Sequence, residues 1–138
     1  MVARKKKVAP VGIPPKEREH LEECAANIKA FLEIWSQIYW TFRHAFLGDP
    51  VTMEKEIRLL QLKSEIARRH QFLYEQLGEH YIGGEMTTDF LRIVVNLEKI
   101  SKTQVENYYK IEKKWQLFLL NLNDSMTTIQ FRLDQEDQ

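Results

Sequence analysis

Residues 29–46 read KAFLEIWSQIYWTFRHAF, and six of these eighteen side chains are Phe, Trp or Tyr. The apolar residues follow a regular spacing of three and four that begins upstream of this stretch and continues through it. Unbroken heptad spacing over more than three heptads predicts a long helix with one buried face. The line consists of Leu21, Ala25, Ile28, Leu32, Trp35, Tyr39, Phe42 and Phe46. We expect its aromatic members to lie in a core, because buried aromatic side chains contribute large apolar areas.

Two further segments have the same periodicity. The apolar line of one runs from Leu59 to Tyr81, and that of the other runs from Val94 to Leu122. The later segment opens with FLRIVVNL at residues 90–97, which resembles a strand, but its length and its continuing heptad favour a helix. Gly48-Asp49-Pro50 and Gly83-Gly84 separate the three segments, since Gly and Pro end helices and form turns.

The sequence therefore predicts an all-α fold, an elongated antiparallel three-helix bundle with coiled-coil-like heptad packing. The helices are expected at about 16–47, 51–82 and 87–123, preceded by a basic Lys/Pro tail over 1–15 that we expect to be flexible. Two alternatives stay open for residues 124–138, which end in an acidic tail. Helix three continues to about residue 133, or Asn123-Asp124-Ser125 breaks it and caps a short fourth helix.

Several large apolar residues do not fit the heptad lines. Trp40 lies off the line of helix one and Leu47 follows it by seven residues, while the other residues of this kind point away from the lines of helices two and three. In an antiparallel three-helix bundle these residues would make one end apolar all round, which is typical of an interface. The alternative is that residues 124–135 fold back and cover this end. The predicted partner-binding set is Trp40, Leu47, Met53, Ile57, Leu60, Leu117 and Leu120.

The charge is balanced overall but uneven along the chain. Lys plus Arg and Asp plus Glu both total 20, which argues against a wholly basic nucleic-acid binder. The consecutive basic residues Arg4, Lys5, Lys6 and Lys7 are a candidate anion-binding segment, because they would attract phosphate backbones or anionic lipid.

The sequence offers little chemistry for catalysis or for metal and cofactor binding. Glu17 and His20 form the one Glu-x-x-His pair, where a di-metal helical site needs two such pairs and two more carboxylates. No phosphate-binding Gly loop and no nucleophile–base pair is present, so we expect no cofactor and no enzymatic activity. His70 is expected to be a hydrogen-bonded core or boundary histidine, and Cys24 an inert buried thiol.

The single Cys24 fits the cytoplasm or another reducing intracellular compartment. We see no apolar run that would span a bilayer and no secretory signal. The expected function is a non-enzymatic helical protein–protein interaction module: a scaffold, adaptor or accessory subunit that docks a partner or a second copy through the apolar bundle end. The alternative is a nucleic-acid- or anionic-surface-binding protein tethered by the basic tail.

Overall fold

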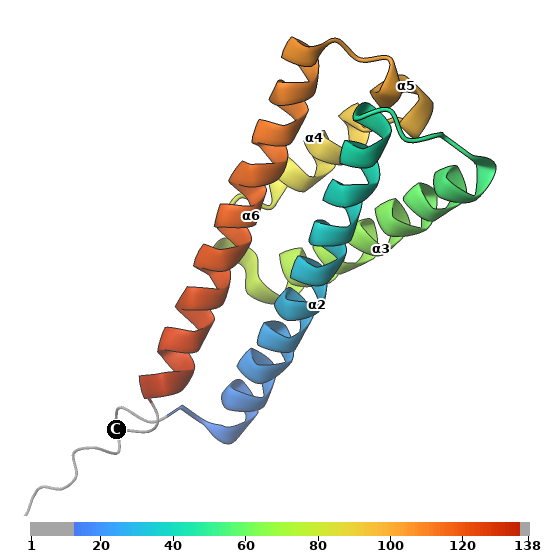
Figure 1. Ribbon diagram of the computed structural model, residues 1–138. Helices are drawn as coiled ribbons and strands as arrows, with labels where there is room; N and C mark the ends of the chain where they lie inside the picture. Colours follow the sequence, from blue (N-terminus) through green and yellow to red (C-terminus); the bar gives the residue numbers. More distant parts are fainter. Residues whose placement is uncertain (1–12, 136–138) are drawn as a thin grey trace, which may run out of the picture.

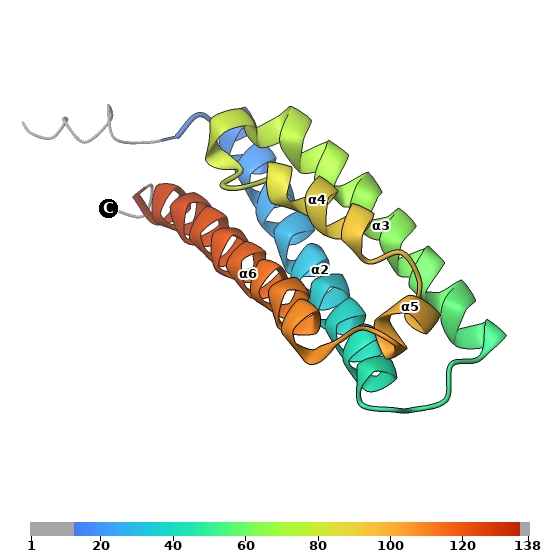
Figure 2. The same cartoon turned by 90° about the horizontal axis from the view of Figure 1, so that it is seen from above.

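The computed structural model describes residues 13–135, and this part of the chain is all-helical. Its elements are α2 (Pro15–Phe46), α3 (Met53–Leu77), the short 3-10 helix η2 (Gly78–His80), α4 (Glu85–Ile93), α5 (Leu97–Ser101) and α6 (Val105–Asp134). Figures 1 and 2 show α2 and α6 as long antiparallel neighbours, and α3 and α4 complete a helical bundle with them. No helix in residues 13–135 is long and apolar enough to cross a membrane.

The turn between α2 and α3 follows from its own residues. Gly48 has a φ of 106°, a left-handed conformation that glycine adopts without steric cost. Its N–H bonds to the carbonyl of Ala45 and that of Asp49 bonds to the carbonyl of His44, which together form a Schellman motif. Thr52 then caps α3 by accepting a hydrogen bond from the N–H of Lys55 at 3.2 Å.

The expected single helix over 87–123 is wrong. The chain forms α4, α5 and the start of α6 over this range, with breaks at residues 94–96 and 102–104. The fold is therefore a helical bundle in which α2 and α4 each contact both α3 and α6.

Side chains of α3 stabilise the first break by bonding to the backbone groups that it leaves without helical partners. The Glu56 carboxylate accepts from the N–H of Leu97 at 2.7 Å and from that of Glu98 at 3.2 Å. The Lys63 ammonium donates to the carbonyl of Val94 at 2.6 Å, and burial lowers the pKa of Lys63. Asn96 caps α5 by accepting from the N–H of Lys99. Buried backbone groups need such partners, so these contacts hold the helix ends in place.

After the two breaks, α6 runs antiparallel to α2. The ring of Phe46, at the end of α2, stacks on Tyr108, near the start of α6, with 3.7 Å between ring centroids. At the other end, Arg18 donates to the carbonyl of Leu133. Helix α6 thus begins where α2 ends and runs back along it.

Helix α6 continues through Asn123-Asp124-Ser125, so of the two alternatives the structure has the extension and not a short fourth helix. Ser125 is fully buried, and its hydroxyl accepts from the N–H of Ile82 at 3.0 Å. This bond ties the loop before α4 to α6.

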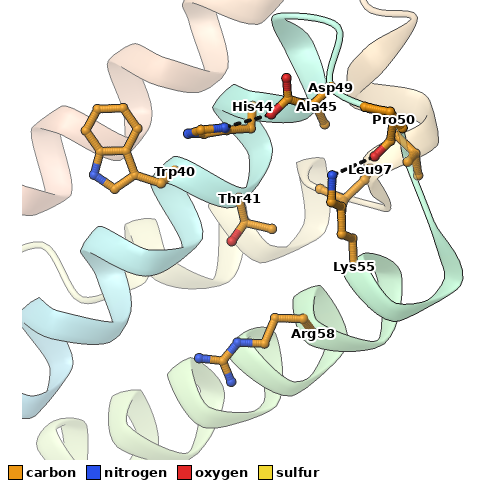
Figure 3. Close-up of a pocket in the computed structure, with 10 residues that line it drawn as sticks. Trp40, Thr41, His44, Ala45, Asp49, Pro50, Lys55, Arg58 and Leu97 are labelled. Carbon is orange, nitrogen blue, oxygen red and sulfur yellow. Dashed lines mark hydrogen bonds and ion pairs between the residues drawn. The ribbon is translucent and has the colours of Figure 1, made fainter.

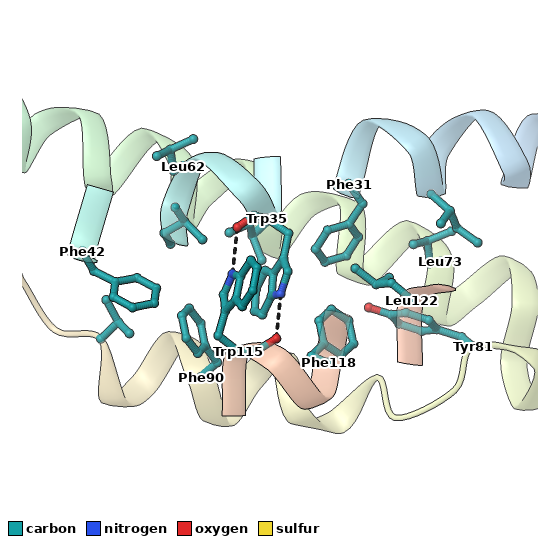
Figure 4. Packing of buried hydrophobic residues seen from close by; sticks show 14 of the residues in the cluster. Phe31, Trp35, Phe42, Leu62, Leu73, Tyr81, Phe90, Trp115, Phe118 and Leu122 are labelled. Carbon is teal, nitrogen blue, oxygen red and sulfur yellow. Dashed lines mark hydrogen bonds between the residues drawn. The ribbon is translucent and has the colours of Figure 1, made fainter. Parts of the chain in front are cut away.

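The core centres on aromatic residues of α2, α4 and α6 (Figure 4). Phe90 of α4 lies 4.7 Å from Trp35, measured between ring centroids. The most buried line of α2 is Cys24, Ile28, Phe31, Trp35, Ile38 and Phe42, each 0% exposed. Four members of the predicted line, Leu21, Leu32, Tyr39 and Phe46, are instead only partly buried. The centre of the buried face of α2 therefore lies to one side of the predicted heptad line, because α2 packs against α3, α5 and α6.

Candidate functional site

The seven residues predicted to bind a partner are all exposed, from 42% for Leu117 to 77% for Met53. They lie on three helices and the turn after α2: Trp40 belongs to α2, Leu47 follows it, Met53, Ile57 and Leu60 belong to α3, and Leu117 and Leu120 to α6. The predicted anion-binding residues Arg4, Lys5, Lys6 and Lys7 lie outside the described residues.

The structure does not bring these residues together at one end of the molecule. Because α6 runs antiparallel to α2, its residue Trp115 lies against Trp35, and Leu117 and Leu120 follow towards the middle of α2. Met53, by contrast, begins α3 just after the end of α2. The C-terminal part of α6 does not fold back over Trp40, because α6 remains one continuous helix to Asp134.

Trp40 lies at the rim of a cavity of about 410 Å³ between α2, α3 and the turn that joins them (Figure 3). His44 Nδ1 is 2.9 Å from a carboxylate oxygen of Asp49, and Lys55 Nζ donates to the carbonyl of Pro50 at 2.8 Å. Arg58 donates to the side-chain oxygen of Gln37. These polar groups are already bonded within the chain, so they do not converge on the cavity as a set of ligand-binding groups.

A second cavity, of about 430 Å³, lies at the opposite end and includes His20 and His80 in its lining. His20 Nε2 is 3.8 Å from Cys24 Sγ, and burial raises the pKa of that thiol. Within residues 13–135, no three His, Cys, Asp or Glu side chains gather into a group that could hold a metal ion.

The outward face of α3 carries an extended pattern of exposed apolar residues. From Met53, steps of four and three residues lead through Ile57 and Leu60 to Tyr74, and these four side chains are 77%, 48%, 59% and 63% exposed. Steps of four and three are the spacing of coiled-coil contact positions. We call this line the outer seam, and it consists of Met53, Ile57, Leu60, Ser64, Ala67, Gln71 and Tyr74, all of them exposed.

The outer seam lies opposite the buried face of α3. The buried residues of this helix are Leu59, Leu62, Ile66, Leu73 and Leu77. Helix α3 thus has two heptad lines, one in the core and one that no helix of the described chain covers. At 100° per residue, Met53, Ile57 and Leu60 fall well away from Leu62 and Ile66, which is why one helix can carry both lines.

The two sides of the outer seam differ. On one side, Glu56 and Lys63 are bonded to the backbone of the α4–α5 break. Val95 of that break is 45% exposed and shares with Leu60 a shallow cavity of about 310 Å³, which extends the apolar surface. The other side is lined by exposed polar residues: Glu54, Gln61, Arg68 and Glu75.

Sequence reasoning found the first three residues of the outer seam and missed the last four. Ser64, Ala67 and Gln71 have no large apolar side chain, so they gave no hydrophobic signal. The signal that was available is the spacing, which continues unbroken from Leu60 to Tyr74.

Comparisons of the chain with protein families, curated proteins and solved structures found no match.

Proposed function

We propose that this protein is a non-enzymatic helical protein–protein interaction module, acting as a scaffold, adaptor or accessory subunit of a larger assembly. It docks a helix of another molecule against the outer seam of α3. The observation that carries this proposal is the second heptad line of α3, whose large apolar members are 48% to 77% exposed.

The residues of the outer seam suit a helical partner better than an extended one. Anchors at i, i+4 and i+7 are the contact pattern of a helix packed along its length on another helix. Ser64 and Ala67, in the middle of the line, allow a close approach of the partner backbone. The partner helix therefore needs an apolar line of its own, with large residues opposite Ser64 and Ala67.

The flanking charges define the partner further. Glu54 and Arg68 are exposed and lie fourteen residues apart. Both are on the side of the outer seam away from the α4–α5 break, which we call its open side. A complementary helix carries a basic residue near Glu54 and an acidic residue near Arg68. Such rim charges set orientation and partner choice more than affinity.

Site-specific photocrosslinking tests this function. A photoreactive residue at position 60 of the full chain, introduced into cells, should give a discrete adduct, because Leu60 lies within the docking surface. The same residue at position 120 is the matched control, since Leu120 is 60% exposed and Leu60 is 59% exposed. The position-60 adduct should disappear when Ile57→Glu is added. Equal labelling at both positions, or none at position 60, would contradict the proposal.

Binding to nucleic acid or an anionic surface through Arg4, Lys5, Lys6 and Lys7 is the second candidate function. It is favoured by the four consecutive basic residues in the sequence. Such binding weakens steeply with salt and is lost on deleting residues 1–9, whereas helix packing on the outer seam is little changed by either. A salt titration of the full and shortened chains distinguishes the two functions.

A further inference from the structure

We propose that the helix docked on the outer seam is α3 of a second copy of this chain, packed antiparallel, so that the protein forms a two-fold symmetric dimer. This inference rests on the proposed function, which supplies the docking surface, and adds the identity and direction of the partner. An interface of this symmetry uses the same residues on both subunits, so the surface must be complementary to itself.

The sizes of the side chains along the outer seam are self-complementary. Its first half has the large residues Met53, Ile57 and Leu60, whereas its second half begins with the small residues Ser64 and Ala67 and ends with Gln71 and Tyr74. Antiparallel packing places the first half of one copy against the second half of the other.

Heptad geometry then sets the register of the two helices. Contact layers in an antiparallel pair place Leu60 opposite Ser64 of the partner subunit and Ile57 opposite Ala67 of the partner subunit. Large residues therefore fill the space left by small ones, as in well-packed cores. The two-fold axis passes midway between Leu60 and Ser64.

The charges on the open side of the outer seam agree with the same register. It places Glu54 beside Arg68 of the partner subunit, and by symmetry Arg68 beside Glu54 of the partner subunit. Arg68 is 72% exposed and is paired with Glu65 of its own helix, which also bonds to Arg69. Arg68 can therefore turn to the second copy while Glu65 keeps Arg69 as its partner.

The opposite side of the outer seam is compatible with this dimer. Lys63 would lie near Lys63 of the partner subunit, but its ammonium is bonded to the carbonyl of Val94 in its own chain. Exposed Val95 adds apolar surface on this side.

A parallel arrangement of the two helices satisfies neither the size pattern nor the charge pattern of the outer seam. It would place Ser64 opposite Ser64 and Ala67 opposite Ala67 of the partner subunit, which leaves space in the middle of the interface. It would also bring Lys63 close to Arg68 of the partner subunit, and like charges at these flanking positions repel. The outer seam therefore favours the antiparallel pair.

The first test reverses one charge at a time in the full chain. Glu54→Arg and Arg68→Glu should each raise the dimer dissociation constant by roughly tenfold, because each replaces two attractive pairs with two repulsive ones. An equal mixture of the two variants should form heterodimers with near wild-type affinity, since both cross-subunit pairs are then restored. Within one chain these residues lie ~21 Å apart at 1.5 Å per residue, so rescue by mixing requires contact between copies.

The second test reports the direction of packing. In the antiparallel pair, position 61 lies close to position 61 of the partner subunit, so Gln61→Cys should form an intermolecular disulfide on mild oxidation. Met53→Cys is the matched control, because the two copies of position 53 lie roughly 27 Å apart along the helix axes. Cys24 is fully buried and does not compete.

The outcomes separate this inference from the function on which it rests. A disulfide through Met53→Cys in place of Gln61→Cys, or mixed charge variants that do not associate, overturns the antiparallel dimer. If the position-60 photoadduct has a mass other than two chains, the dimer is overturned while the docking function stands. If position 60 gives no adduct at all, both are overturned.

Discussion

Trp35 and Trp115 exchange hydrogen bonds in the centre of the core. The indole N–H of Trp35 donates to the main-chain carbonyl of Trp115 at 3.0 Å, and the indole N–H of Trp115 donates to the carbonyl of Trp35 at 2.8 Å. Their rings are parallel within 3°. The pair satisfies both buried indole donors and fixes the register of α2 against α6 (Figure 4).

Trp35→Phe should therefore lower the free energy of unfolding by about 2–3 kcal/mol, because it removes a buried hydrogen bond and leaves a void. Urea unfolding followed by circular dichroism measures this change. Trp40→Phe is the control, since Trp40 is 55% exposed, and its cost should stay within about 0.5 kcal/mol. Equal costs for the two variants would show that the Trp35–Trp115 pair does not stabilise the core.

Glu56→Ala should destabilise the α4–α5 break, because Glu56 accepts from the N–H groups of both Leu97 and Glu98. The loss should be about 1–2 kcal/mol, as for a helix cap. Hydrogen exchange at those two amides should accelerate, while exchange in the middle of α2 changes little. Glu33→Ala removes an exposed carboxylate from α2 and should affect neither measurement. Unchanged exchange at Leu97 in Glu56→Ala would argue against this role.

His70 should make the stability depend on pH. Burial lowers its pKa below the ordinary value of 6.5, and its Nδ1 lies 2.9 Å from the hydroxyl of Tyr81. Between the lowered folded-state pKa and 6.5 the unfolded chain binds more protons than the folded chain, so stability falls as the pH falls through this range.

His70→Gln should remove this part of the pH dependence, as measured by thermal unfolding at a series of pH values. His80→Gln, a change at an exposed residue that keeps His70, should retain it. A dependence that persists unchanged in His70→Gln would exclude His70 as its source.

Gly83→Ala should cost more stability in the wild type than in an Asn121→Ala background. Gly83 has a positive φ of 68°, so its substitution carries a backbone cost in either background. In the wild type, a Cβ at Gly83 would also collide with the Asn121 carboxamide. The difference in the free energy of unfolding should be about 1 kcal/mol or more. Equal costs would mean that Asn121 moves aside freely.

Much of the fold follows from local signals in the sequence. The Gly48-Asp49-Pro50 turn, the helical periods and the all-α class all rest on residues close together in the chain. The breaks after α4 and α5 do not follow from local signals alone. Asn96 is a local capping signal, but the carboxylate that holds the start of α5 belongs to Glu56, forty-one residues before Leu97. Heptad spacing alone could not predict a break that depends on such distant partners.

The candidate site was predictable in part, for a related reason. Leu60 and Leu120 stand out in the sequence because each departs from the main apolar line of its helix. Whether such residues share a surface depends on the direction of each helix. The third helix of the predicted bundle would run parallel to the first, whereas α6 runs antiparallel to α2. Ala67 and Ser64 became informative only when the outward face of α3 was known.

The light-scattering mass of the purified chain over a wide range of concentration tests the central claim most directly. The wild type should rise from the mass of one 16.5-kDa chain to that of two. Leu120→Glu should behave in the same way, while Leu60→Glu stays at one chain mass. A wild type that is a monomer throughout, or a Leu60→Glu variant that pairs as the wild type does, would contradict the proposed dimer.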